Sequence, residues 1–133
     1  MRDFKLEVLT PEREFFKGRA EALTVELPDG QLTVLAGHIP MVAVLKPGAM
    51  RVKREGTWRI CFVSEGFMEV RPDEVLVYSQ TCEYPDEIDR RRAQEALERA
   101  QERLRQRQSF IEHKATQATI ARAMARLRVK GGK

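Results

Sequence analysis

The chain has 133 residues, 42% of them hydrophobic and 33% charged, which suffices for one core with an appendage and is too short for two large domains. No apolar run reaches 18 residues, and no uncharged signal-type core follows the first residues, so we expect a protein that is made and kept in the cytosol. Residues 1–84 carry 11 basic and 13 acidic side chains, a net charge of −2, and residues 85–133 carry 13 basic and 7 acidic ones, a net charge of +6. The basic C-terminal part suits an anionic partner.

Short runs rich in valine and leucine fill residues 4–81, and no segment with helical periodicity interrupts them. The runs are separated by turn signals, among them Pro-Asp-Gly at 28–30, Lys-Pro-Gly at 46–48 and Arg-Pro-Asp at 71–73. The predicted strands are residues 4–9, 14–19, 23–27, 32–35, 42–45, 50–53, 58–63, 67–70 and 75–81. This spacing is typical of a β-sandwich or a barrel.

After Pro85 the composition changes to alanine, arginine, glutamate, glutamine and leucine, which favour helices. Asp86 predicts the start of a first helix, because its side chain can cap the free backbone amides there. Asp89, three residues on, places a negative charge near the positive end of the helix dipole. The helix should run to about residue 105. Ser109 and Glu112 form a capping-box pattern that predicts a second helix, running to about residue 129. The connector at 106–108 favours an antiparallel hairpin, but it could also straighten into one longer helical arm.

Arginines interrupt the apolar face of the second predicted helix. Arg122 and Arg126 fall on the stripe that also holds three alanines and Ile111, although a solvated face would be their ordinary place. An unpaired buried guanidinium is costly, so these residues need carboxylates, an anion or open water. Asp89 and Glu95 are the nearest acids in the first helix, while cations outnumber acids there, which suits a polyphosphate. The alternative is that both arginines reach solvent and line a basic helix.

No catalytic or metal-binding set emerges from the sequence. Cys61 and Cys82 lie in strand-like runs without a Cys-x-x-Cys pair, which favours buried free thiols. His38 and His113 fall in separate halves, and a structural turn residue is the favoured interpretation of His38. The glycine-rich phosphate loop of nucleotide hydrolases is also missing.

Several segments together resemble the epsilon subunit of bacterial F-type ATP synthases. They are Leu-Ala-Gly-His-Ile-Pro at 35–40, Leu-Lys-Pro-Gly at 45–48 and Ser-Glu-Gly-Phe-Met-Glu-Val at 64–70, and the likeness covers essentially the whole chain in family order. Glu65 stands where the family's Gly-Gly-Phe element has another glycine. The resemblance implies an α+β fold, in which an N-terminal antiparallel β-sandwich (residues 1–84) precedes a mobile C-terminal antiparallel two-helix hairpin (residues 85–133).

The resemblance also implies a non-catalytic rotor subunit of a proton-translocating enzyme. Its expected partners are the gamma subunit of the central stalk and the membrane c-ring. The two C-terminal helices, here called the arm, would contact the alpha and beta catalytic subunits. We expect it peripherally at the cytoplasmic face of the bacterial plasma membrane, without insertion into the membrane. An extended arm would inhibit ATP hydrolysis, and a basic arm suits an acidic segment of the catalytic subunits.

Some members of this family bind ATP through an Ile/Leu-Asp-x-x-Arg-Ala signature, matched here at residues 88–93. The ATP-binding residues implied by the resemblance are Glu83, Ile88, Asp89, Arg92, Ala93, Arg99, Arg122 and Arg126. Glu83 and the backbone at 88–89 would contact the adenine end, Asp89 would also orient arginines, and the four arginines would hold phosphates. ATP is the expected regulatory ligand, it would relieve inhibition by holding the arm folded, and a need for magnesium is not evident.

Two other classes of protein remain open at this stage. A basic helical hairpin on a β-domain could bind nucleic acid, although Phe110 is the one aromatic residue in the helices available for stacking. An enzyme built on the sandwich would need converging acid, base or nucleophile residues. Copurification separates the three: stalk subunits, nucleic acid or an isolated turnover activity.

Overall fold

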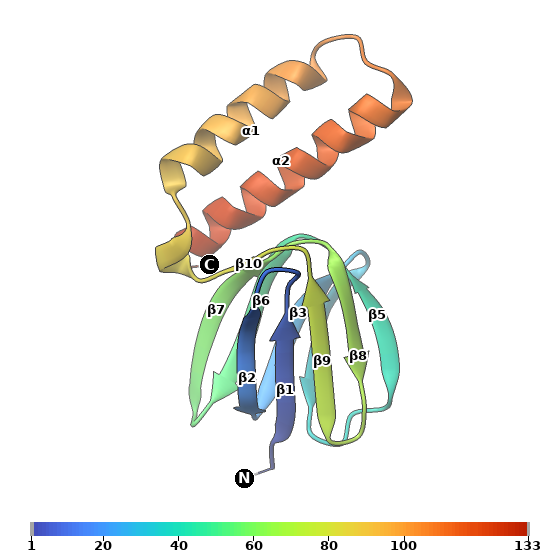
Figure 1. The fold of residues 1–133 in the computed structure, drawn as a ribbon, viewed down its shortest axis with the longest axis vertical. Helices are drawn as coiled ribbons and strands as arrows, with labels where there is room; N and C mark the ends of the chain where they lie inside the picture. The colour runs from blue at the N-terminus through green and yellow to red at the C-terminus, as the bar shows by residue number, and fades with distance from the viewer. Residues whose placement is uncertain (1, 133) are drawn as a thin grey trace.

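A computed structural model describes residues 2–132, in which two five-stranded sheets form a sandwich and two helices lie over one end of it (Figure 1). The strands are β1 (Phe4–Leu9), β2 (Glu14–Ala20), β3 (Ala22–Leu27), β4 (Gly30–Leu35), β5 (Met41–Leu45), β6 (Gly48–Arg54), β7 (Thr57–Val63), β8 (Gly66–Val70), β9 (Glu74–Ser79) and β10 (Cys82–Glu83). The predicted sandwich followed by two helices is confirmed. Residues 1 and 133, the outermost of the two predicted domains, lie outside the described residues.

The sheets have the strand orders β2-β1-β9-β8-β5 and β10-β7-β6-β3-β4. All pairs are antiparallel except β1 with β9, which run parallel. Alternate residues of the strands face inward, because successive side chains of a strand point to opposite faces. Phe4, Leu6 and Val8 of β1, for example, are buried in a core shared by both sheets.

Two turns require glycine for different reasons. The β6–β7 turn has positive φ at both central residues, 50° at Glu55 and 77° at Gly56, which matches the twist of a two-residue hairpin. Gly66 at the start of β8 has no room for a side chain, because a Cβ there would collide with the carbonyl oxygen of Tyr78 on β9. The second glycine therefore fixes how closely β8 and β9 approach.

The first helix begins later than the sequence predicts. Residues Pro85–Glu87 form a short 3-10 turn (η1), and α1 spans Arg90–Leu104. Asp86 does not cap the helix; Asp89 does, and its carboxylate accepts a hydrogen bond from the backbone amide of Arg92 at 3.1 Å. Ile88 just before the cap has extended backbone and a buried side chain, so a helix starting at Asp86 would turn Ile88 away from its contacts.

The second helix, α2, spans Phe110–Lys130, and the predicted cap at Ser109 is confirmed. The Ser109 hydroxyl accepts from the Glu112 amide at 3.2 Å and lies 3.0 Å from the Glu112 carboxylate. The apolar stripe is shorter than predicted, because Ile111 near the hairpin tip is 79% exposed. Buried residues of α2 gather instead toward its C-terminal half, at Ala123, Ala125 and Val129.

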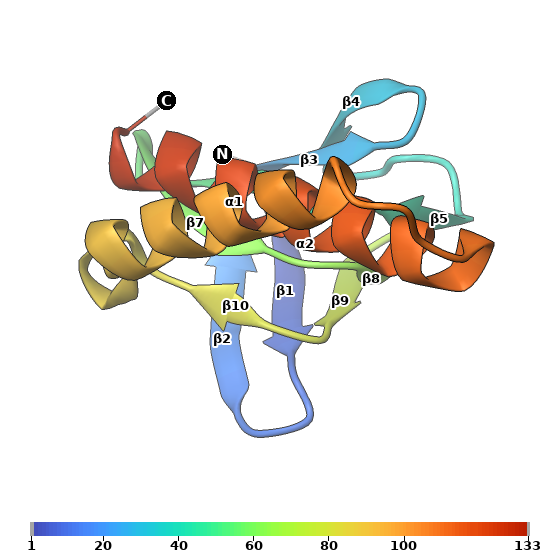
Figure 2. The same ribbon diagram turned by 90° about the horizontal axis from the view of Figure 1, so that it is seen from above.

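The arm rests on the outer face of β6 and β7 through α2, while α1 packs on the far side of α2 (Figures 1 and 2). The contact is a second small apolar cluster separate from the sandwich core. Its buried members are Ala49, Phe62, Ile88, Ala125 and Val129. Since Phe62 points outward from β7, this part of the sheet is covered on both faces.

Candidate functional site

A cleft of about 240 Å³ lies where α1, α2 and the segment before α1 meet. All eight residues of the predicted ATP site line this cleft: Glu83, Ile88, Asp89, Arg92, Ala93, Arg99, Arg122 and Arg126. The structure therefore brings together a set that spans 44 residues of sequence, from 83 to 126. Four further residues complete the lining, Glu87, Ala96, Thr119 and Ala123, which the sequence analysis did not include.

Helical spacing explains why these side chains converge. Arg92, Ala96 and Arg99 are separated by four and three positions on α1, so they share one face. Thr119, Arg122 and Arg126 do the same on α2, and the two faces meet because the helices pack as a hairpin. Alanines between the arginines keep the space between the helices open. Spacing alone would have found Ala96, Ala123 and Thr119, each three or four positions from a predicted arginine.

Arg126 is held by the sandwich. Its Nε donates to Glu83 Oε1 at 2.7 Å, and its guanidinium lies 4.6 Å from the centroid of the buried Phe62 ring. Glu83 and Phe62 are register partners on β10 and β7, which places the acid and the ring side by side under α2. Both charged side chains are only 25–29% exposed, so this pair is better shielded from water than ordinary surface ion pairs.

Arg122 reaches the sandwich at a different point. One terminal nitrogen donates to Glu65 Oε2 at 2.7 Å, and the other contacts the Thr119 hydroxyl at 3.3 Å. The prediction that Arg122 and Arg126 could find carboxylate partners in α1, at Asp89 or Glu95, is wrong. Asp89 caps α1, and Glu95 pairs with Arg91 on the exposed side.

The reason is that α2 lies between α1 and the strands, so acids of the sandwich are nearer to its arginines. One signal in the sequence could have pointed to Glu65. It is a carboxylate at a position where the resembling family has glycine.

The α1 side of the cleft is electrostatically different from the α2 side. Within residues 2–132, no carboxylate lies within 4.0 Å of the charged nitrogens of Arg92 or Arg99. Both arginines are exposed, whereas Arg122 and Arg126 are partly buried and paired. The cleft therefore offers two uncompensated cations beside two compensated ones, an arrangement that attracts a ligand with several negative charges.

The segment that carries the cleft residues into α1 is clamped to β2. Arg13 donates to the Cys82 carbonyl and to Glu87 Oε1, both at 3.0 Å, and Tyr84 stacks on Phe15 with 4.2 Å between ring centroids. The Arg13 hydrogen bond, with help from the Tyr84 backbone amide, lowers the pKa of Glu87. This clamp keeps residues 82–87 with the sandwich, so a movement of the arm would begin after Glu87.

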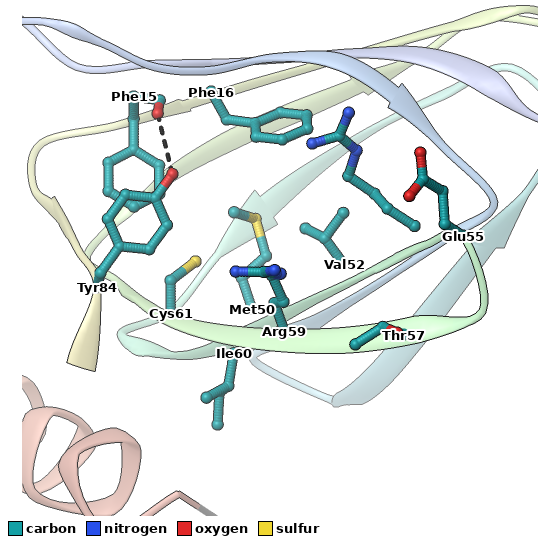
Figure 3. Close-up of a pocket in the computed structure, with 11 residues that line it drawn as sticks. Phe15, Phe16, Met50, Val52, Glu55, Thr57, Arg59, Ile60, Cys61 and Tyr84 are labelled. Atoms are coloured by element: carbon teal, nitrogen blue, oxygen red, sulfur yellow. Dashed lines mark hydrogen bonds between the residues drawn. The ribbon is translucent and has the colours of Figure 1, made fainter. Parts of the chain in front are cut away.

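A larger cavity, of about 470 Å³, opens where β2 separates from β6 and β7 (Figure 3). Phe15, Phe16, Met50 and Tyr84 provide its apolar walls, and the Tyr84 hydroxyl donates to the Phe15 carbonyl at 3.3 Å across one end. Figure 3 draws Arg59 and Glu55 among its lining residues. The lining brings together no nucleophile with a base, and the one thiol present, Cys61, has its pKa raised by burial.

Metal and membrane features were also sought in the described chain. Residues 2–132 contain no group of three or more histidine, cysteine, aspartate or glutamate side chains able to hold a metal ion. None of the described helices combines the length and apolarity needed to cross a membrane. Cys61 and Cys82 are both buried and unbonded, which confirms the prediction of buried free thiols.

Comparison with known proteins assigns the family. A sequence model described as the ATP synthase delta/epsilon chain beta-sandwich domain matches residues 3–85, and one described as the delta/epsilon chain long alpha-helix domain matches residues 86–131. The chain belongs to the ATP synthase delta/epsilon family. It resembles the ATP synthase epsilon chain of Ruminiclostridium cellulolyticum, with 45% identity over 127 residues, or 96% of this chain and 95% of that one. The epsilon chain of Caldanaerobacter subterraneus is also 45% identical, over 95% of this chain and 92% of its own length.

Solved structures share the fold. A chain in the mitochondrial ATP synthase of Euglena gracilis superposes with a TM-score of 0.82 at 23% identity, covering 92% of this chain and 78% of that one. A chain in the central stalk and c-ring assembly of the Tetrahymena thermophila mitochondrial enzyme gives 0.69 at 11% identity, covering 97% of both chains. The resemblance to epsilon subunits inferred from the sequence is thereby confirmed.

Proposed function

We propose that this epsilon-type chain is a non-catalytic rotor subunit whose arm inhibits ATP hydrolysis when it extends, and that ATP bound in the cleft holds the arm folded. The observation that carries the proposal is the composition of the cleft, which combines both helices with the clamped segment before α1. A ligand there bridges parts that separate when the arm extends. Binding and folding of the arm are therefore linked.

The charges of the cleft favour ATP over a singly charged ligand. Arg92 and Arg99 are free to meet phosphates, and Arg122 and Arg126 lie opposite them on α2. The backbone at Ile88 and the Glu83 carboxylate, both in the lining, would contact the adenine ring and its amino group. The carboxylates of the cleft lining already hold bonds: Glu83 to Arg126, Glu87 to Arg13 and Asp89 to the Arg92 amide. This supports binding of ATP without hydrolysis.

A ligand can decide whether the hairpin stays closed, because α1 buries few apolar groups against α2. The buried residues of α1 are two alanines, Ala93 and Ala100, which contribute little apolar area. ATP at 100 times its Kd would stabilise the folded arm by about 2.7 kcal/mol. This is enough to reverse a balanced equilibrium but not a strongly biased one.

An exposed apolar surface on the sandwich supports assembly with other subunits. Val42 and Val44 point outward from β5 and are 71% and 66% exposed, and Val44 lies opposite Phe67 on β8. The Phe67 ring stacks on Tyr78 of β9 at 5.5 Å, so the patch crosses three strands. Contiguous apolar patches of this kind mark protein interfaces. We assign this side of the sandwich to the gamma subunit and the c-ring, and the basic arm to the alpha and beta subunits.

In this assembly the chain would couple the catalytic sector to the proton-translocating ring. It would lie peripherally at the cytoplasmic face of the bacterial plasma membrane. Isolated from that assembly, it would have no turnover activity and no affinity for nucleic acid.

Calorimetric titration of the full chain with ATP and ADP tests the ligand. The double variant Arg92→Ala/Arg126→Ala should lose ATP binding, because it removes one cation from each side of the cleft. Arg91→Ala/Arg103→Ala is the matched control, with two arginines removed from α1 outside the cleft lining. Equal loss in both variants would mean that general charge, and not the cleft, binds ATP. No binding by the unaltered chain would refute the nucleotide part of the proposal.

A further inference from the structure

The two arginines of α2 that line the cleft, Arg122 and Arg126, pair with acids at very different places on the sandwich. Glu83, the partner of Arg126, itself lines the cleft, whereas Glu65, the partner of Arg122, does not. Glu65 lies in the short connection between β7 and β8, on the sandwich. Arg122 therefore lines the cleft, while its bond to Glu65 points the guanidinium toward an acid outside the cleft lining.

Glu65 has little freedom to follow Arg122 toward a ligand, because its backbone is fixed. Its carbonyl accepts from the Gln80 amide at 3.1 Å, and the next residue, Gly66, is pressed against the backbone of β9. The preceding residue, Ser64, is buried and its hydroxyl accepts from the Thr81 amide at 2.8 Å. The backbone that carries the carboxylate is thus anchored, which limits how far the anion can follow Arg122.

The Glu65 carboxylate is also only half compensated. Its Oε2 receives the Arg122 bond, while its Oε1 is buried and has no hydrogen-bond partner among residues 2–132. A carboxylate with one orphaned oxygen depends strongly on its single cation. The Glu65 Oε2 atom lies 2.7 Å from a terminal nitrogen of Arg122, the distance at which a phosphate oxygen would bind the same guanidinium.

We propose that Glu65 is an internal competitor of the ligand's phosphates for Arg122, and so lowers the affinity of the cleft for ATP. The proposal rests on the proposed function, since it concerns the ligand of the same cleft. Arg92 and Arg99 can engage phosphates without displacing any acid, whereas Arg122 must first leave Glu65. In the ligand-free chain the same ion pair ties α2 to the sandwich. Glu65 therefore helps to hold the arm folded without a ligand, and it raises the ATP concentration at which the cleft fills.

The test compares ATP affinities by calorimetry for the full chain and for Glu65→Gln, which keeps the side-chain shape and removes the charge. We expect binding to tighten by about two- to fivefold, the range for losing a partly exposed ion-pair competitor. Glu26→Gln is the matched control. Glu26 is also a sandwich carboxylate that pairs with an arginine of α2, Arg128 at 3.6 Å, but neither residue lines the cleft. This variant should loosen the arm without tightening ATP.

A double-mutant cycle isolates the route through Arg122. In an Arg122→Ala background, Glu65→Gln should leave ATP affinity unchanged, because the arginine for which Glu65 and the phosphates compete is gone. Unchanged ATP binding in Glu65→Gln alone would overturn the proposal. Weaker binding would overturn it too, because it would make Glu65 a residue that positions Arg122 for the ligand. Tightening that persists without Arg122 would overturn it too. If the unaltered chain and Glu65→Gln both fail to bind ATP, the proposed function itself falls and the competitor role falls with it.

Discussion

Replacing Val129 with alanine measures how firmly the arm is attached to the sandwich. Val129 is fully buried in the small cluster with Phe62, Ile88 and Ala125. Loss of two methyl groups costs about 1.6 kcal/mol of transfer free energy, and the cavity left behind raises the cost to roughly 2 kcal/mol. The ratio of detached to attached arm should then rise about 30-fold.

Limited trypsin digestion reports that ratio, because cleavage by dilute protease follows the population of the open form. The arm is rich in arginine, so its cleavage should accelerate about 30-fold in Val129→Ala while the sandwich stays intact. Met124→Ala is the control, since Met124 lies on the exposed side of α2. ATP at 100 times its Kd should restore about 2.7 kcal/mol and suppress cleavage of both forms. Equal rates for the two variants, or melting of the sandwich in Val129→Ala, would refute the reasoning.

Other contacts give three further expectations. Because Arg13 lowers the pKa of Glu87 below its ordinary value of 4.5, the clamp contributes stability above that pH and loses it as pH falls through the lowered pKa; urea unfolding at several pH values should show this dependence, and Arg13→Ala should weaken it, leaving the part due to the Tyr84 amide. Gly66→Ala should destabilise the sandwich by about 3 kcal/mol, because the added Cβ meets immovable backbone; an unchanged thermal midpoint would contradict this. Burial raises the pKa of Cys82 to about 11 and that of Cys61 further, so neither thiol should react with Ellman's reagent at neutral pH until the chain unfolds; prompt labelling of the native chain would be the contrary result.

Local sequence signals predicted most of the fold, and the misses have identifiable causes. Turn residues and alternating valines located nine strands, and only the two-residue β10 was not anticipated, because a pair as short as Cys82–Glu83 has no periodicity to detect. The predicted start of the first helix was Asp86, three positions before Asp89, which is the cap in the structure. Burial of Ile88 against Phe62 chose the later one, and that contact depends on a strand 26 residues away in sequence.

The candidate site divides in the same way. The eight residues were predicted from a family signature at 88–93 and the family's additional positions, and in the structure all eight line one cleft. Their ion-pair partners did not follow, since Glu65 and Glu83 are distant in sequence from Arg122 and Arg126. Periodicity determines which face of a helix a side chain occupies, because it depends on neighbouring residues alone. Only the docking of α2 on β6 and β7 decided which acids that face would meet, because packing joins segments whose separation the sequence does not encode locally.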